Sequence, residues 1–221
     1  MRSFKNIALL AVMLSAAGSA WARHRSHANE AASGDFAYYL LSLSWSPAFC
    51  LESPGADECS GPRRLGFIVH GLWPQYERGW PEHCDFRRPV PDDVVQSIAD
   101  MMPARNLVYH EWAAHGTCSG LEPAAFFALV RRAYSNVSIP QELSAPVQAL
   151  EKPPAAIADA FLRVNPRLSA RSVVVTCTGQ GAPRLREVRV CLDRELAPRD
   201  CSADAMRGAC KAAQVIIPPI R

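Results

Sequence analysis

The segment HEWAAHGTC, residues 110–118, contains two histidines and a glutamate, residue types that metal sites and acid–base catalysis both use. In HExxH zinc proteases the two histidines are four positions apart, so they share one face of a helix. Here His110 and His115 are five positions apart, and on a helix that spacing separates two side chains by roughly 140°. Ala114 occupies the position of the second zinc ligand. The spacing argues against a zinc site, and we expect no metal and no other cofactor.

Another histidine lies in the segment FIVHGLWPQYERGW, residues 67–80. His70 follows the apolar run LGFIV (65–69), which predicts a short buried strand. Gly71 comes directly after it and predicts a turn. A strand end before a glycine turn can present a side chain into a cleft, so we expect His70 to lie at a site.

Histidines in two such segments predict proton-transfer chemistry. An imidazole has an unperturbed pKa of about 6.5, so one histidine can act as base while another acts as acid. Cleavage of a phosphodiester by its own 2′-hydroxyl uses such a pair, and a third, protonated histidine would hold the phosphate. Trp73, Tyr76 and Trp80 offer aromatic surfaces for unpaired bases. The pattern predicts a nuclease for single-stranded RNA. A peptidase is disfavoured because HExxH and Gly-x-Ser-x-Gly motifs are absent from the sequence.

The remaining sequence predicts an α+β domain. Strands are predicted at 36–45, 172–177, 186–192 and 214–218, and helices at 92–102, 123–134 and 154–165. A turn-rich segment at 47–62 predicts a loop. The aromatic stripe of the helix at 123–134 is expected to pack in the core. Because strands and helices do not alternate regularly, a doubly wound sheet is disfavoured.

Residues 1–22 have the features of a secretory signal peptide: Arg2 and Lys5 precede a short apolar run, and Ala20-Trp21-Ala22 forms a cleavage site. The run is too short for a permanent membrane anchor. We expect an exported protein of the periplasm or medium, with a flexible arm at 23–34 and one catalytic domain at 35–221.

The chain has 24 Lys and Arg against 21 Asp and Glu, so loss of Arg2 and Lys5 leaves a net charge of +1. That balance disfavours a broad basic face for long nucleic acids.

The cysteines predict a disulfide framework. All eight follow the signal peptide: Cys50, Cys59, Cys84, Cys118, Cys177, Cys191, Cys201 and Cys210. An even number in an exported chain, with no C-x-x-C pair, favours disulfides over metal ligands or catalytic thiols. Eight cysteines allow about 105 pairings, and spacing alone does not choose between them.

Four segments together resemble the ribonuclease T2 family, the secreted acid ribonucleases. FIVHGLWP and HEWAAHGTC are similar to its two signature segments, and LSLSWSPAFC and REVRVCLD are similar to its first strand and a C-terminal strand. The resemblance covers roughly residues 36–213. It implies a central, mostly antiparallel sheet with helices packed around it. It also implies four disulfides: Cys50–Cys59, Cys84–Cys118, Cys177–Cys210 and Cys191–Cys201.

The resemblance also implies residue roles by motif position. His70 would be the general acid that protonates the departing 5′-oxygen, and His115 the general base on the 2′-hydroxyl. His110 would bind the phosphate, and Glu111 would help to stabilise the phosphorane-like transition state. Trp73 would pack beside the phosphate and the base site. The implied reaction is transphosphorylation of single-stranded RNA to a 2′,3′-cyclic phosphate, followed by slower hydrolysis, without a metal.

The sequence departs from the family where a lysine usually precedes the second-signature histidine, because Ala114 stands there. Loss of one charge-stabilising group can cost on the order of 100-fold in rate, so we expect a slower enzyme unless another Arg or Lys compensates. The alternative is a catalytically impaired ribonuclease fold that binds RNA or another partner. Tyr76 and Trp80 are candidate base contacts, and Gln75 leaves base preference open. A monomer is the expected state.

Overall fold

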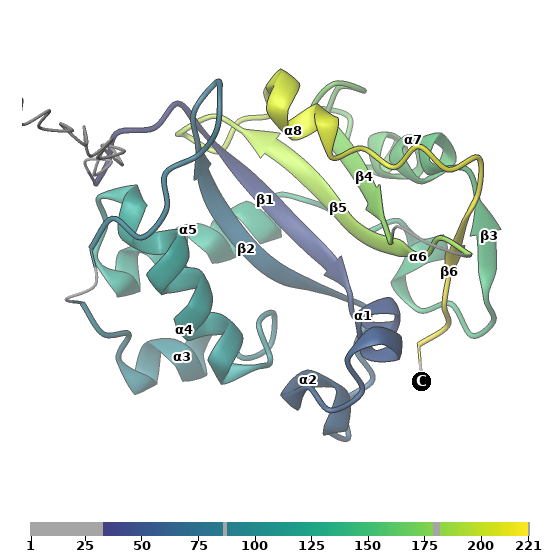
Figure 1. The fold of residues 1–221 in the computed structure, drawn as a ribbon, viewed down its shortest axis with the longest axis horizontal. Coiled ribbons are helices and arrows are strands. Elements are labelled where there is room, and N and C mark those ends of the chain that lie inside the picture. The colour runs from purple at the N-terminus through teal and green to yellow at the C-terminus, as the bar shows by residue number, and fades with distance from the viewer. Residues whose placement is uncertain (1–32, 86–87, 179–181, 221) are drawn as a thin grey trace, which may run out of the picture. The chain divides into compact units, whose positions relative to one another are not determined.

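A four-stranded antiparallel sheet forms the centre of the fold in the computed structural model (Figure 1). The structure describes residues 33–85, 88–178 and 182–220. The strands are β1 (Tyr38–Trp45), β2 (Phe67–Gln75), β4 (Val173–Cys177) and β5 (Leu185–Leu192), in the order β2-β1-β5-β4. A second, two-stranded sheet pairs β3 (Leu150–Lys152) with β6 (Val215–Ile217). The predicted α+β class with an antiparallel sheet is confirmed, and the predicted strand at 214–218 lies outside the main sheet.

The two faces of the main sheet differ in chemistry. On one face of β1, Leu41, Leu43 and Trp45 are fully buried in the main hydrophobic core. On the other face Ser42 pairs with Arg189 and Ser44 pairs with Glu187, both on β5. Side chains alternate between faces along a strand, so each strand supplies the core with one set of residues and the opposite face with the other. This polar face, which also carries a small apolar cluster around Tyr38 and Leu40, is therefore the one available for a site.

Helices supply the remainder of the core. They are α1 (Ser46–Glu52), α2 (Asp57–Ser60), α3 (Asp92–Ser97), α4 (Arg105–Ala114), α5 (Pro123–Ser135), α6 (Gln141–Ser144), α7 (Pro154–Val164) and α8 (Ala203–Arg207), with the 3₁₀ helix η1 (Gly116–Ser119) after α4. Phe126, Phe127 and Val130 of α5 are buried, as predicted from their spacing. No helix within the described ranges is long and apolar enough to cross a membrane.

Three local predictions are wrong. The segment at 47–62 is not a loop, because it forms most of α1 and all of α2, with Pro47 in the first turn of α1, where proline suits a helix. The helix predicted at 92–102 ends at Ser97, and the chain from 98 to 102 forms turns instead. The strand predicted at 65–69 extends to Gln75, because β2 pairs with β1 along its whole length. Gly71 therefore lies inside a strand, not in a turn.

The four disulfides implied by the family resemblance are all present: Cys50–Cys59, Cys84–Cys118, Cys177–Cys210 and Cys191–Cys201. The predicted signal peptide (1–22) and most of the predicted arm (23–34) lie outside the described residues. The end of that arm is held in place, because Ser33 Oγ donates to Thr117 O at 2.7 Å and Gly34 N donates to Cys118 O at 2.9 Å. The flexibility of the arm at 23–34 stays a prediction.

Candidate active site

A β-bulge in β2 positions His70. Gly71 pairs with Ser42 and Val69 pairs with Leu43, so His70 is an extra residue opposite β1. A bulge re-aims side chains and is frequent beside active sites. Here it directs His70 to the polar face of the sheet, where its ring reaches Glu187 on β5. The prediction that His70 sits at a strand end is wrong, and the bulge performs the task that a turn was expected to perform.

Two buried carboxylates flank the His70 ring. Its Nδ1 lies 2.6 Å from Glu187 Oε1, and its Nε2 lies 3.5 Å from Glu111 Oε1. Burial disfavours the charged ring, but the hydrogen bond with Glu187 and the charges of Glu111 and Glu187 outweigh it, so the pKa of His70 is raised. His70 is therefore held as an imidazolium over a wider pH range than a free histidine.

Glu187 is the partner that fixes this ring. Its side chain is 1% exposed, and Arg189 binds its second oxygen through Nε at 2.8 Å and Nη2 at 2.6 Å. Burial alone favours the neutral acid, but the hydrogen bond from His70 and the charges of Arg189 and His70 lower the pKa of Glu187 to about 2. Sequence reasoning missed both β5 residues. The available signal was two charged residues alternating with buried valines in REVRV.

Glu111 approaches from α4 and is 2% exposed. The Trp73 indole Nε1 donates to Glu111 Oε2 at 2.6 Å. Burial raises the pKa of Glu111 to about 7, against the opposing effects of the His70 charge and the Trp73 hydrogen bond. Near neutral pH this carboxyl is therefore divided between its neutral and charged forms, unlike Glu187.

Trp73 lies at the centre of the cluster. Its ring centroid is 5.2 Å from that of His70 and 5.3 Å from that of His115. The Arg189 guanidinium carbon lies 5.1 Å from the Trp73 ring centroid, a cation–π distance. The indole thus contacts both candidate proton-transfer groups and fixes the spacing between them.

The glycine of the first signature is required by this packing. A Cβ at Gly71 would overlap the Glu111 carboxylate and the Trp73 indole, so only glycine lets the two side chains meet across the strand. We predict that Gly71→Ala displaces that pair and lowers kcat by on the order of 100-fold, as expected for a 1 Å misplacement. Steady-state kinetics on RNA measures this effect. Gly55→Ala is the control, because its Cβ would meet open space, and equal losses in the two variants would contradict the prediction.

His115 lies just after α4, where its N–H bonds to Glu111 O at 3.0 Å. Burial lowers the pKa of His115 to about 4, and the charges of His110, His70 and His83 act in the same direction. Among the described residues no group lies within hydrogen-bonding distance of its buried Nδ1. A charged ring would need partners for two N–H groups, so this environment favours the neutral form.

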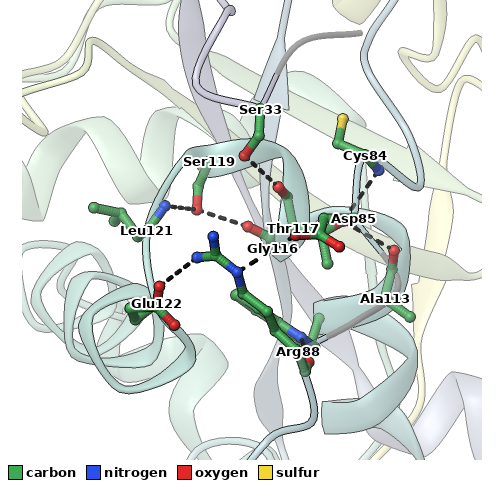
Figure 2. A network of polar contacts seen from close by, with 11 residues as sticks. Ser33, Cys84, Asp85, Arg88, Ala113, Gly116, Thr117, Ser119, Leu121 and Glu122 are labelled. Atoms are coloured by element: carbon green, nitrogen blue, oxygen red, sulfur yellow. Dashed lines mark hydrogen bonds and ion pairs between the residues drawn. The ribbon is translucent and has the colours of Figure 1, made fainter. Parts of the chain in front are cut away.

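The turn after His115 is tied to three other segments (Figure 2). Thr117 Oγ1 accepts from Cys84 N at 3.2 Å and donates to Ala113 O at 3.2 Å, while its carbonyl accepts from Ser33. In the same network, Arg88 forms ion pairs with Glu122 and Asp85 (Figure 2). The Cys84–Cys118 bridge closes this network, so the position of His115 depends on contacts made by both signature regions.

Gly116 and Ala114, which flank His115, are both closely packed. A Cβ at Gly116 would overlap the Trp112 ring, which is buried in the core. Ala114 is 4% exposed, and its carbonyl accepts from His83 N at 2.9 Å. At this position the chain therefore places a small apolar group where the family usually has a cation.

Two cavities adjoin the cluster. One, of about 260 Å³, is lined by Trp73, His115, Arg189, Gln75 and Trp80, with Trp80 53% exposed. The other, of about 290 Å³, lies on the side of His70 and Glu187 and is bordered by Phe49 and Glu58, among others. His110 is exposed in an adjoining hollow that also contains Phe49 and Glu58. Tyr76 packs against the main core instead.

Of the residues predicted from the sequence, the structure brings together His70, Trp73, Glu111 and His115. Gln75, which is buried, and Trp80, which is exposed, line the cavity beside them, whereas Tyr76 packs against the core and His110 lies at the edge. The arrangement provides one imidazole whose pKa is raised and one whose pKa is lowered, on either side of an indole. Groups whose environments separate their pKa values in this way are suited to paired acid and base roles.

Parts of this chain are similar in sequence to known ribonucleases. A ribonuclease of Aeromonas hydrophila is 43% identical over 122 residues, which is 55% of this chain and 55% of that protein. Ribonuclease I of Escherichia coli (strain K12) is 29% identical over 176 residues, 60% of this chain and 65% of that protein. The first of these matches thus spans about half the length of the relative.

Solved structures show the same fold at lower identity. An RNase-related protein from Calystegia sepium superposes with a TM-score of 0.66 at 24% identity, covering 85% of this chain and 99% of that one. RNase NT, solved in complex with 5′-AMP, gives a TM-score of 0.61 at 21% identity, covering 84% and 100%. A model of the family described as ribonuclease T2 matches residues 36–201, most of the chain. The protein therefore belongs to the ribonuclease T2 family.

Proposed function

We propose that this protein is an endoribonuclease that cleaves single-stranded RNA by transphosphorylation, using His115 as base and His70 as acid without a metal. The observation that carries the proposal is the opposite shift of the two imidazoles around Trp73. The pKa of His115 is lowered to about 4 and that of His70 is raised. Above a pH of about 4 and below the raised pKa of His70, the base is neutral while the acid is protonated, which is the state that the reaction needs.

In this mechanism His115 removes the proton of the 2′-hydroxyl, and the 2′-oxygen attacks phosphorus. The bond to the 5′-oxygen breaks as that oxygen takes the proton from His70. The products are a 2′,3′-cyclic phosphate and a free 5′-hydroxyl. Hydrolysis of the cyclic phosphate then uses the same two residues in reversed roles.

The neighbouring groups have supporting roles in this proposal. Glu111, with a pKa of about 7, can donate a hydrogen bond to a phosphoryl oxygen when neutral, which would help to stabilise the crowded transition state. His110, at the edge of the site, would bind a phosphate when protonated. Trp80 and Gln75 border the cavity beside His115 and are candidate base contacts, and Tyr76 stays a candidate despite packing against the core.

The cellular setting is part of the proposal. Four disulfides suit a protein that matures in an oxidising compartment. We infer export to the periplasm or the medium after cleavage behind Ala22, and action as a monomer. Mass analysis of the protein recovered outside the cytoplasm would locate the mature N-terminus.

The direct test is incubation of the oxidised protein with single-stranded RNA, with and without EDTA, followed by analysis of the product ends. We expect EDTA-resistant cleavage that leaves 2′,3′-cyclic phosphates and 5′-hydroxyls. Cleavage that stops in EDTA would contradict the metal-independent mechanism. Absence of cleavage by folded protein would favour the alternative, an impaired ribonuclease fold that binds RNA or another partner.

The two histidines predict an asymmetric pH profile. For the free enzyme, kcat/KM should rise through a pH of about 4 as His115 loses its proton, and fall only above pH 6.5 as His70 loses its own. Ionisation of Glu111 near pH 7 adds to the alkaline limb. Initial rates on a short RNA from pH 3 to 9 measure both limbs. An acidic limb centred near 6.5 would contradict a base with a lowered pKa.

Because Ala114 carries no charge, we expect kcat to be lower than it would be with a lysine at this position. We expect Ala114→Lys to raise kcat, by up to about 100-fold, because an ammonium would stabilise charge on the phosphorane. The four-carbon stem can follow the apolar surface and bring its head group to solvent or substrate. Kinetics and urea unfolding should be measured together. An unchanged kcat in a stable variant would show that Ala114 does not limit the rate.

A further inference from the structure

A continuous chain of contacts links Arg189 to His70. Arg189 holds Glu187 Oε2 with two nitrogens, at 2.8 and 2.6 Å, while Glu187 Oε1 receives His70 Nδ1 at 2.6 Å. Each oxygen of this buried carboxylate therefore has its own cationic or hydrogen-bonding partner. Side chains that share one carboxylate are coupled, because a change in one alters the charge seen by the other.

Arg189 also contacts the second half of the site. Its guanidinium carbon lies 5.1 Å from the Trp73 ring centroid, and Trp73 donates to Glu111. Its side chain is 23% exposed and lines the cavity that contains His115. Arg189 thus reaches both carboxylates that face His70, one by direct contact and the other through the indole.

The charge around His70 explains what such an arginine would do. The charged and titratable groups that face His70 are Glu187 and Arg189 on β5, Glu111 on α4, Glu58 on α2 and His115 after α4, with Glu52 and Arg186 in the same cavity wall. Carboxylates predominate among the nearest groups. Two of them beside one imidazole stabilise its charged form, and an imidazolium that is stabilised too strongly is a poor proton donor.

We propose that Arg189 is a positioning residue that acts through Glu187 to keep His70 a strong enough acid to protonate the departing 5′-oxygen. It thereby supplies positive charge to a centre where Ala114 supplies none. The inference rests on the proposed role of His70 as general acid. The direct coupling has the required sign, because the charge of Arg189 acts to lower the pKa of His70.

The test compares Arg189→Met, Arg189→Lys and Arg199→Met in the full oxidised protein. Arg199 is the matched control, since it also stacks on an aromatic ring, that of Tyr38 at 4.4 Å, and pairs with a carboxylate, that of Glu77 at 2.9 Å. NMR titration of the His70 ring should show an upward pKa shift of roughly one unit in Arg189→Met. Arg189→Lys should restore most of the original value, and Arg199→Met should not change it.

Kinetics provides a readout that a structural role would not reproduce. With RNA, Arg189→Met should lower kcat about 3- to 10-fold and move the alkaline limb to higher pH. With uridine 3′-(p-nitrophenyl phosphate), whose leaving group needs no proton, kcat should change little. In a Glu187→Gln background the substitution of Arg189 should have a smaller effect on the pKa of His70, because the coupling carboxylate is then absent.

Two results would overturn the inference: an unchanged pKa of His70 in Arg189→Met, or equal losses of kcat on both substrates. If Arg189→Met does not fold, Arg189→Gln replaces it in both measurements, because it also removes the charge while keeping a polar side chain beside Glu187. Failure of the proposed function would look different. In that case His70→Ala would retain full RNA cleavage, whatever the titration of the Arg189 variants shows.

Discussion

We expect His70→Ala and His115→Ala each to lower kcat on RNA by about 10²- to 10⁴-fold, the range expected for loss of one general acid or base. The double variant should lose little more than either single variant, because residues that act as one unit give strongly non-additive effects. Initial rates with a fluorogenic RNA measure all three. Full activity in either single variant would contradict the pair mechanism.

A change of leaving group separates the two roles. A p-nitrophenolate departs without protonation, so His70→Ala should recover much of its rate on uridine 3′-(p-nitrophenyl phosphate). His115→Ala should remain impaired there, since the 2′-hydroxyl still has to lose its proton. If His115→Ala recovered its rate on this substrate and His70→Ala did not, His115 would be the general acid and His70 the general base. Circular dichroism of both variants ensures that the comparison concerns chemistry and not folding.

Removal of the Cys84–Cys118 bridge should have a large effect on stability. The cysteines are 34 residues apart, and loop-entropy estimates give about 3–4 kcal/mol for such a bridge. We expect Cys84→Ser/Cys118→Ser to lose about that much free energy of unfolding in urea. It should also lose activity while still folded, because the bridge joins the loop after the first signature to the turn that follows His115.

The Cys177–Cys210 bridge provides a matched control. Its cysteines are 33 residues apart, so it constrains a nearly equal loop in the unfolded chain. Cys177→Ser/Cys210→Ser should lose similar stability but retain kcat under conditions where the protein is fully folded. If both double variants lost activity equally, the Cys84–Cys118 bridge would have no specific part in placing His115.

The sequence allowed most of the main elements and the core of the site to be predicted. Strong periodicity identified the helix at 123–134, and the two signatures identified His70, Glu111 and His115. The short helices α1 and α2 were missed because their turn-forming residues outweigh any apolar repeat over so few positions. The disulfide pairing came from the family resemblance, since spacing alone left it open.

Glu187 and Arg189 could not be found in the same way. Their importance depends on the register that places Ser44 opposite Glu187 and Ser42 opposite Arg189, and on the bulge that turns His70 toward them. The bulge arises from the pairing of β1 with β2, and the register from the pairing of β1 with β5, which lies more than 100 residues later in the sequence; neither segment alone encodes which residues will face each other.

The bulge at His70 also separates the residues of β2 that serve catalysis from those that form the sheet. If His70 were deleted, Val69 and Gly71 would become neighbours in the strand, and their positions already lie opposite Leu43 and Ser42 in regular register. The remaining strand would alternate regularly and still bury Val69 and Leu72. The residues on either side of His70 therefore determine the pairing of β2 with β1. His70, the proposed general acid, is an insertion that this pairing does not need. The residue at position 70 can therefore change during evolution of the catalytic activity without changing the pattern of residues that pairs β2 with β1.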